Sequence, residues 1–382
     1  MRTAVTRSAV SGLLFLPVRA LACTTTIVSA EASATGRPMI WKQRDADGEN
    51  NIMAYVKGPK YAYTALFATS DSLHKKAYAG INEAGFAIAN NLSYNMRQVL
   101  DDPGTRNGEL MGRALGECAS LADFAAFLDA WEQPRGVSAN FAVLDAHGGA
   151  AYFEVSDTTC VRYDVPEGAY LYRTNFSLSG KENVGGGYVR YETMGRRLER
   201  HGSRKFSAGF FFKEGRSFIN VLSGGNALRF RFGGLLNQHD FIARDASVSS
   251  VVIEGVAPGE DPSSGMMWCA VGWPPSSYAI PVWVAAGEHI AAPLTSEANL
   301  LSLELKHSVR AFPWEGGEKY LKVRPLRRIL RTVRRAEKKE LRAGAALDRR
   351  FRDGGFSLEA VEQYNNEAQQ RFEAFKNKVK TP

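Results

Sequence analysis

The stretch ACTTTIVSAEASATGRPMIWKQRDAD, residues 22–47, decides the fold. Residues 23–29 are rich in Thr, Ile and Val, which favours a β-strand, and residues 39–44 form a second candidate strand. Residues 33–38 between them read SATGRP, a composition typical of a turn. The stretch therefore predicts a β-hairpin close to the N-terminus.

The predicted hairpin brings a cysteine close to two charged residues. If the chain turns near residues 34–36, the position opposite Cys23 falls at about 46–48, and Arg44 and Asp47 flank the thiol. A guanidinium beside a thiol stabilises the thiolate, and a carboxylate beside an α-amine can orient that amine. If Cys23 is an ordinary residue, Arg44 and Asp47 are simply charged residues at a solvated strand end. If Cys23 is the processed N-terminus of the chain, we expect them to form a catalytic site with it.

The residues before Cys23 have the features of a secretory signal peptide. Residues 1–8 are basic and free of acid, residues 9–18 are apolar, and Ala20-Leu21-Ala22 fits an A-x-A cleavage site. We therefore predict that residues 1–22 are removed on export to the periplasm or the extracellular space. A buried N-terminal helix and lipid modification of Cys23 are the alternatives. Lipidation normally requires Leu at the position that Ala20 occupies.

An N-terminal cysteine carries a nucleophile and a base on one residue. A free thiol has a pKa of about 8.5 and an α-amine one of about 7.7–8.0, so the amine can accept the thiol proton near neutral pH. No separate histidine is needed for this chemistry. The six histidines are scattered outside any triad motif, and the sequence has no G-x-S-x-G motif.

The other cysteines carry little information about function. The sequence has four cysteines, at positions 23, 118, 160 and 269, with no CxxC pair and no Cys/His spacing typical of zinc. In an exported protein one disulfide could join two of Cys118, Cys160 and Cys269, and the sequence does not choose among the pairings. We expect neither a metal nor an organic cofactor.

The sequence resembles the cysteine N-terminal-nucleophile (Ntn) hydrolases. This superfamily includes choloylglycine (bile salt) hydrolase, penicillin V acylase and the acyl-coenzyme A:6-aminopenicillanic acid acyltransferase-like proteins. The resemblance rests first on residues 22–47 and extends over roughly residues 23–290. It implies an α+β fold, the four-layer αββα sandwich of Ntn hydrolases, in which the nucleophile begins a central strand. It also implies hydrolysis or acyl transfer at a linear amide C–N bond.

The resemblance assigns roles to residues of the hairpin and of the strands that follow it. Cys23 matches the nucleophile of the Cys-Thr start, and Arg44 with Asp47 matches the Arg-x-x-Asp of the second strand. Asn82-Glu83-Ala84-Gly85 matches a family segment, and the following AIANNLSYN places an oxyanion-binding backbone amide at Asn90 or Asn91.

Two further roles come from later parts of the chain. Asn175, in YLYRTNFS, would supply a side-chain amide to the oxyanion, and Arg244 is the candidate for a late family arginine. Residues 242–255 and 259–284 resemble the exported acyltransferase-like branch more than bile salt hydrolase. The fungal acyltransferase cuts itself before its cysteine, whereas a signal-type site precedes Cys23. This difference favours cleavage by a signal peptidase.

The C-terminal part of the chain differs from the rest in charge. The net charge of the whole chain is +8, but residues 319–350 alone contain thirteen Lys or Arg and three acidic residues, whereas residues 23–318 carry a net −5. We expect a catalytic domain over 23–312, with apolar helical periodicity at 108–132. Residues 313–382 should form two basic helices that are packed on that domain or appended to it.

The expected C-terminal helices span 318–342 and a second segment that Ser357 caps and that ends near residue 378. Two interpretations of these helices are open. They form an amphipathic pair packed on the domain, or they form a basic surface for peripheral contact with an anionic membrane. We expect no nucleic-acid partner for an exported protein.

Together these features predict an exported amidohydrolase or acyltransferase that acts on an acylated small molecule through an acyl-thioester on Cys23. A cysteine dipeptidase of the same fold is the first alternative, and a lipid-anchored protein that binds ligand without catalysis is the second. Bile salts, penicillin V, acyl-homoserine lactones and N-acyl amino acids are all candidate substrates. The sequence does not decide between hydrolysis and transfer, and it does not give the oligomeric state.

Overall fold

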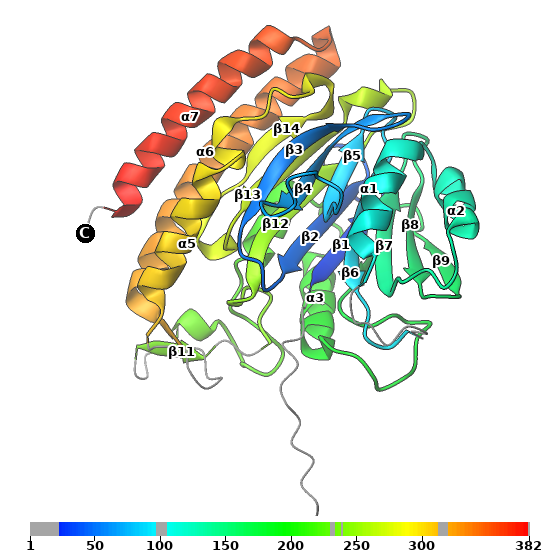
Figure 1. Cartoon of the computed structure of the whole chain (residues 1–382). Coiled ribbons are helices and arrows are strands. Elements are labelled where there is room, and N and C mark those ends of the chain that lie inside the picture. Colours follow the sequence, from blue (N-terminus) through cyan, green and yellow to red (C-terminus); the bar gives the residue numbers. More distant parts are fainter. Residues whose placement is uncertain (1–22, 97–104, 230–233, 238–239, 312–319, 381–382) are drawn as a thin grey trace, which may run out of the picture.

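The computed structural model describes residues 23–96, 105–229, 234–237, 240–311 and 320–380 (Figure 1). The predicted signal peptide, residues 1–22, lies outside these residues. Among the described helices none combines the length and the apolar character that a membrane span requires.

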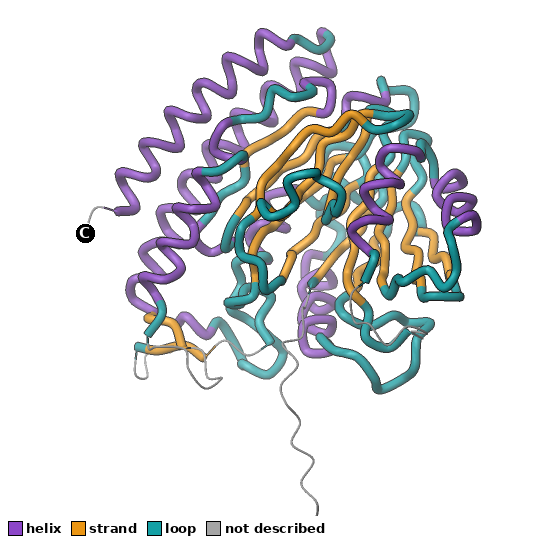
Figure 2. The backbone as a smooth tube through the Cα atoms, in the orientation of Figure 1, coloured by secondary structure: helices purple, strands orange, loops and turns teal. Residues whose placement is uncertain are grey.

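Two antiparallel sheets form the centre of the molecule (Figure 2). The six-stranded sheet has the order β10 (Tyr170–Arg173), β1 (Thr24–Val28), β2 (Met39–Asp45), β12 (Ser247–Glu254), β13 (Met266–Val271) and β14 (Ile280–Trp283). The seven-stranded sheet runs in sequence order through β3 (Asn51–Lys57), β4 (Ala62–Ala68), β5 (Ala79–Asn82), β6 (Ala87–Leu92), β7 (Ala139–Leu144), β8 (Ala150–Val155) and β9 (Cys160–Asp164).

Helices cover the outer faces of both sheets (Figure 1). On the seven-stranded sheet lie α1 (Asn107–Glu117) and α2 (Leu121–Ala130). On the six-stranded sheet lie α3 (Tyr188–His201), α4 (Ala208–Glu214), α5 (Glu297–Val309) and α6 (Val323–Gly354), and α7 (Leu358–Lys380) packs on α6. The predicted four-layer αββα sandwich with a C-terminal helical extension is therefore confirmed.

Aromatic packing holds α2 against its sheet. Phe124 of α2 is fully buried, and its ring lies 5.8, 5.9 and 5.1 Å from the rings of Phe86, Phe141 and Phe153. Each such pair contributes about 0.5–1.5 kcal/mol beyond the area that it buries. The helical periodicity predicted for residues 108–132 corresponds to α1 and α2, and the chain breaks where Ser120 caps α2 by accepting a 3.0 Å hydrogen bond from the Asp123 amide.

The first C-terminal helix starts and ends later than predicted. We expected it over 318–342, but residues Tyr320–Lys322 form β15, which pairs antiparallel with β11 (Leu235–Asn237), and α6 follows directly. Pairing with a strand distant in sequence is a tertiary effect that helical periodicity does not reveal. The predicted cap of the second helix is confirmed, because Ser357 Oγ accepts a 3.2 Å hydrogen bond from the Ala360 amide.

Helix α6 packs closely on the six-stranded sheet. A Cβ atom on Gly344 would lie 2.6 Å from the Trp268 ring and 2.9 Å from Pro281, so this contact requires glycine. The buried Arg37, in the loop between β1 and β2, donates to Glu260 at 2.6 Å and to Asp348 of α6 at 3.4 Å. The loop of the N-terminal hairpin and the C-terminal helix are thus joined by a buried ion pair.

Candidate active site

The predicted nucleophile precedes β1 directly and is 7% exposed. In the hairpin, Thr24 pairs with Gln43, which brings Arg44 opposite Cys23. The predicted partner position, 46–48, was therefore wrong by two to four residues. The loop between the strands is shifted because Ser33 forms a β-bridge to Phe206. The amide of Phe206 donates a hydrogen bond of 2.8 Å to Ala32 O.

Cys23 lies on the face of β1 that packs against the seven-stranded sheet. Alternate residues of a strand share a face, so Cys23 lies on the same face as Thr25. The Thr25 hydroxyl bonds to Asn91 Oδ1 of β6 and lies 2.7 Å from the Tyr152 hydroxyl of β8. The predicted site residue Asn91 is fully buried, and its Nδ2 donates to Arg173 O at 3.3 Å. Its side chain thus fixes β1 to the second sheet.

Arg44 provides a buried cation opposite the thiol. Its guanidinium carbon lies 3.7 Å above the centre of the Tyr78 ring, and Nη1 donates to Asn51 Oδ1 at 3.0 Å. Burial lowers the pKa of Arg44, and the charges of Tyr78 and Cys23 oppose this shift. The expectation that an arginine flanks the thiol is consistent with this placement.

Lys42 is a second buried cation, which the sequence analysis did not single out. It lies 2% exposed on the same face of β2 as Arg44, and its Nζ donates to Asn90 Oδ1 at 2.6 Å and to Tyr78 O at 2.8 Å. Burial lowers the pKa of Lys42 to about 8; the Cys23 charge raises it and Arg44 lowers it. The sequence signal that could have identified Lys42 is its position inside the predicted strand MIWKQR, residues 39–44.

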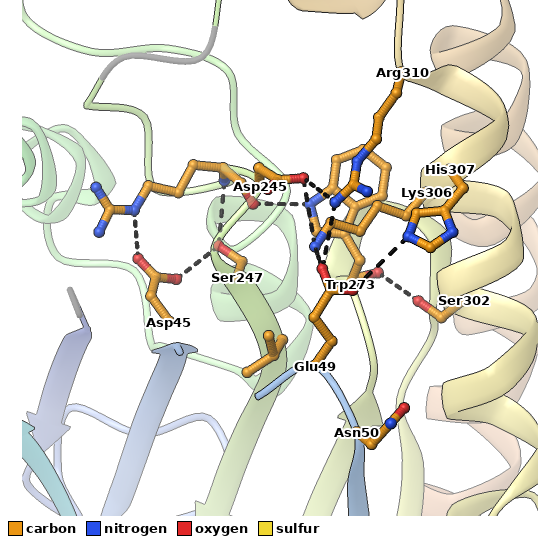
Figure 3. Close-up of polar contacts among 12 residues, drawn as sticks. Asp45, Glu49, Asn50, Asp245, Ser247, Trp273, Ser302, Lys306, His307 and Arg310 are labelled. Carbon is orange, nitrogen blue, oxygen red and sulfur yellow. Dashed lines mark hydrogen bonds and ion pairs between the residues drawn. The ribbon is translucent and has the colours of Figure 1, made fainter. Parts of the chain in front are cut away.

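The carboxylate at the end of β2 that contacts the predicted Arg244 is Asp45 (Figure 3). Asp45 accepts from Arg244 Nε at 2.7 Å and from Ser247 Oγ at 2.7 Å, and its backbone oxygen lies 3.8 Å from Cys23 Sγ. Trp273 Nε1 donates to Arg244 O at 2.8 Å and so fixes this arginine. Arg244 thus lies at the strand end that carries the nucleophile.

The predicted Asp47 lies two residues further on and is exposed. Its role in orienting an α-amine stays a prediction. The loop that carries it is anchored to α5 (Figure 3), because buried Lys306 pairs with Glu49 and lies 3.5 Å from Asp245. Arg310 donates to the same two carboxylates, at 3.4 and 3.0 Å. These ion pairs hold the position of the loop beside the nucleophile.

Arg190 of α3 joins the nucleophile to the predicted Asn175. Its Nη1 donates to Cys23 O at 2.7 Å and to Thr24 Oγ1 at 3.0 Å, and its Nη2 donates to Asn175 Oδ1 at 2.9 Å. Asn175 Nδ2 donates one hydrogen bond, to Leu92 O at 2.8 Å. Among the described residues, the second N–H of this amide has no hydrogen-bond acceptor. Burial and the charge of Arg244 lower the pKa of Arg190 to about 10.

The family relationship is tested by comparison with known proteins. Residues 21–202 match the family model described as acyl-coenzyme A:6-aminopenicillanic acid acyl-transferase. The resemblance to the cysteine Ntn hydrolases is thereby confirmed. A search of the curated proteins finds no match.

Several solved structures are similar to this chain. A Caenorhabditis elegans N-acylethanolamine-hydrolyzing acid amidase ortholog is 14% identical, with a TM-score of 0.41 over 61% of this chain and 92% of that chain. Penicillin V acylase from Agrobacterium tumefaciens is 10% identical, with a TM-score of 0.38 over 69% and 86%. A mutant conjugated bile acid hydrolase from Clostridium perfringens is 12% identical, with a TM-score of 0.31 over 42% and 54%.

Tyr94 is a further residue near the candidate site that the sequence analysis did not single out. Burial raises the pKa of Tyr94, and the charges of Cys23 and Asp47 raise it further, whereas Arg244 and Arg190 lower it. Its hydroxyl therefore lies within electrostatic range of the nucleophile and of both arginines. Because Tyr94 lies in AIANNLSYN, the segment that the resemblance already indicated, its position was available from the sequence.

The site has a positive balance of charge. Lys42, Arg44 and Arg190 are buried, whereas the buried carboxylate of Asp45 is paired with Arg244. Cations in a low-dielectric site stabilise a thiolate, a developing oxyanion or a substrate carboxylate. Among the described residues, no group of three or more His, Cys, Asp or Glu could hold a metal ion.

The other three thiols lie elsewhere in the fold, and none of the four cysteines is bonded to another. Burial raises the pKa of Cys118 to about 12 and raises that of Cys269 as well. Cys160 is exposed on the edge strand β9. A disulfide among these three residues is therefore not present in the structure.

Proposed function

We propose that the chain is an exported Ntn amidohydrolase or acyltransferase that cleaves the linear amide of an acylated small molecule. One observation carries the proposal: Cys23 directly precedes β1, opposite the buried Arg44, with its own carbonyl held by Arg190. The family match over residues 21–202 supports an enzyme that acts on non-peptide C–N bonds. Removal of residues 1–22 would free the α-amine that this chemistry requires.

In the first step, Sγ of Cys23 attacks the amide carbonyl carbon, and the α-amine of Cys23 takes the thiol proton. The carbonyl oxygen becomes an oxyanion, which the second N–H of Asn175 and a backbone amide near Asn91 would stabilise. One such donor is typically worth about 10²–10³ in rate. The C–N bond then breaks, the leaving nitrogen receives the proton from the α-amine, and an acyl-thioester remains on Cys23.

In the second step, a water molecule attacks the thioester while the α-amine accepts a proton from that water. The C–S bond breaks, the acid leaves, and the thiol is restored. If an amine attacks in place of water, the product is a new amide and the enzyme acts as a transferase. The two outcomes share the thioester and differ only in the acceptor.

The test compares the mature chain, which begins at Cys23, with Cys23→Ala and with Cys160→Ser, a matched change at the exposed thiol of β9. The substrates are N-acyl amino acids, N-acyl ethanolamides, bile-salt and penicillin V amides, and dipeptides. We expect amidase activity and an acyl adduct on Cys23 in acid-quenched mass spectra, both lost only in Cys23→Ala. Activity that survives in Cys23→Ala would refute the mechanism.

Two further readouts separate the alternatives. Activity on dipeptides alone would instead assign the chain to the cysteine dipeptidases. Mass spectrometry of the exported protein should show an unmodified N-terminal Cys23. A diacylglyceryl group on Cys23, or a blocked α-amine, would assign it to lipid-anchored binding proteins, because a blocked amine cannot act as the base.

A further inference from the structure

The solvent-facing side of α6 is a continuous strip of positive charge. Between Arg324 and Arg350 it exposes eleven cations, and at a rise of about 1.5 Å per residue they extend over about 39 Å. We call this set the α6 strip. Its members are Arg324, Arg327, Arg328, Arg331, Arg334, Arg335, Lys338, Lys339, Arg342, Arg349 and Arg350.

The acidic residues of this stretch face inward and do not neutralise the strip. Glu337 is buried and accepts from Arg216 at 2.6 and 2.5 Å. Glu340 is buried and accepts from Arg371 at 2.8 and 3.0 Å. Asp348 is buried beside Arg37. Within the described parts of the chain, no cation of the α6 strip forms an ion pair.

Two adjoining cavities run along one side of the strip. One has a volume of about 1000 Å³ and the other about 850 Å³, and both are lined by Asn226, Arg229 and Arg334. The wall opposite α6 adds Arg197 and Lys213 to the first cavity. On the other side of α6, a third cavity of about 400 Å³ is lined by members of the strip and by Lys378 of α7. Cations therefore occupy the helix and the hollows on both sides of it.

The strip lies near a further cation. Burial lowers the pKa of Arg334, the nearby charge of Arg216 lowers it further, and the charge of Glu337 raises it. Like charges that are held close together repel one another, and an anionic partner relieves this repulsion. Because the net charge of residues 23–318 is −5, such a partner would attract the α6 side and repel the rest of the molecule.

We propose that the α6 strip docks the protein on a membrane surface rich in anionic phospholipid. Guanidinium groups pair with phosphate in bidentate fashion, and nine of the eleven members of the strip are arginines. The strip is much longer than a small anion, and it covers both sides of the helix, which suits an extended surface. This interaction is independent of the proposed amidase function.

The mode of contact follows from the apolar residues of α6. Leu326, Ile329, Leu330, Val333 and Leu347 are buried against the domain. The helix therefore adsorbs on the headgroups through charge and does not insert its apolar face. Among the described residues that line the two larger cavities, none is aromatic.

The test is co-sedimentation of the protein with vesicles of phosphatidylcholine that contain about 30% phosphatidylglycerol, in about 50 mM and about 500 mM salt. The variant Arg327→Gln/Arg331→Gln/Arg334→Gln/Lys338→Gln removes four cations from the strip. The matched control Lys57→Gln/Lys60→Gln/Lys75→Gln/Arg200→Gln removes four exposed cations elsewhere. The amidase activity of the same samples is measured on a soluble substrate. This activity shows that a variant is folded, and it tests the proposed function independently of vesicle binding.

We expect the wild type and the control to sediment with the anionic vesicles in low salt and to be released in high salt. Each cation near an anionic surface is worth a factor of about five in binding, so the strip variant should bind at least about 100-fold more weakly. Equal binding to pure phosphatidylcholine, equal binding by the strip variant, or no sedimentation of the wild type would overturn the proposal. Tighter binding to soluble polyphosphate or to an oligonucleotide than to vesicles would overturn it as well.

Discussion

The guanidinium of Arg190 donates a 2.7 Å hydrogen bond to the carbonyl oxygen of Cys23, which precedes it by 167 residues. The same side chain reaches Thr24 and Asn175, so one residue of α3 fixes the nucleophile, its neighbour and a candidate oxyanion donor. Arg190 is a positioning residue, because it holds the backbone of Cys23 and the side chain of Asn175 in one geometry.

Replacing Arg190 should therefore affect turnover more than substrate binding. Arg190→Lys keeps the charge but cannot reach three acceptors, and we expect kcat to fall by about 10²-fold with little change in KM. The matched control is Arg196→Lys on the exposed face of the same helix, where only a pair with Glu192 is lost. Steady-state kinetics on the best amide of the panel provides the measurement. An unchanged kcat, or a loss confined to KM, would contradict the assignment.

Arg44 should control the reactivity of the nucleophile. Because this buried cation lies opposite Cys23, Arg44→Gln should lower the rate of alkylation of Cys23 by iodoacetamide at pH 7 by about tenfold or more. The reaction is followed by peptide mass spectrometry in a Cys160→Ser background, which removes the exposed thiol of β9. Lys57→Gln, on an exposed position of β3, serves as the control for loss of a positive charge. A similar alkylation rate in both variants would show that Arg44 does not act on the thiol.

Lys42 predicts a pH dependence of stability. Its pKa is lowered from 10.5 to about 8 by burial, so between these values the unfolded chain holds a proton that the folded chain has released. The unfolded state then binds more protons, and the contribution of Lys42 to the free energy of unfolding rises with pH from about 8 to 10.5.

The comparison of Lys42→Met with its parent isolates this effect, in a Cys23→Ala background that removes titration of the nucleophile. In urea unfolding at pH 7.5, 8.5 and 9.5, the stability advantage of the parent over Lys42→Met should grow with pH. The corresponding difference for Lys60→Met, an exposed lysine, should stay constant. A difference for Lys42→Met that is flat or falls with pH would contradict the prediction.

Glu154 should be important for stability because it forms a buried ion pair. Its carboxylate accepts from Arg173 at 2.7 Å and from the amides of Leu178 and Ser179, just after Asn175. Glu154→Gln leaves the Arg173 charge buried without a counterion, and we expect a loss of about 3–5 kcal/mol in the free energy of unfolding.

The matched control for Glu154 is an exposed pair on the neighbouring strand. Asp164→Asn breaks the ion pair with Arg162. Because the Asp164 side chain is 65% exposed and that of Arg162 is 43% exposed, the free energy of unfolding should fall by less than about 1 kcal/mol. Urea denaturation of the three proteins gives the comparison. If both substitutions cost the same, burial of the Glu154 pair would not be the source of its contribution.

The charge of the site predicts a preference among substrates. Three buried cations against one paired carboxylate favour a leaving group that carries a carboxylate. We therefore expect kcat/KM for an N-acyl amino acid to exceed that for the N-acyl ethanolamide of the same chain length by at least about tenfold, and the ratio to shrink with added salt. A ratio near one, or one that does not respond to salt, would argue against electrostatic selection.

The sequence predicted features that depend on neighbours in the chain. The strands of the hairpin, the two helices within 108–132 and the cap at Ser357 follow from local composition, and the structure confirms them. The register of the hairpin did not follow, because its loop is held by Phe206, a residue far along the chain. Local turn rules contain no information about that contact.

The same distinction between local and long-range information applies to the residues of the candidate site. The structure places Cys23, Arg44 and Arg244 at one strand end, and the roles that the resemblance assigns to them stay predictions. Asp45 was missed because the expected register favoured Asp47. Arg190 was missed because a helix that packs on the outside of a sheet gives no signal in sequence of which strand end its side chains reach.

The buried pair of Arg37 and Asp348 has a practical consequence for engineering. Arg37 lies in the hairpin that begins at Cys23, and Asp348 lies in the helix that carries the α6 strip. A chain truncated before α6 would remove Asp348, one of the carboxylate partners of Arg37. It would also expose the face of the six-stranded sheet that α6 covers. Deletion of the C-terminal helices therefore weakens the anchoring of the loop between β1 and β2. The proposed docking and the proposed catalysis are therefore best separated by substitutions on the outer side of α6 rather than by truncation.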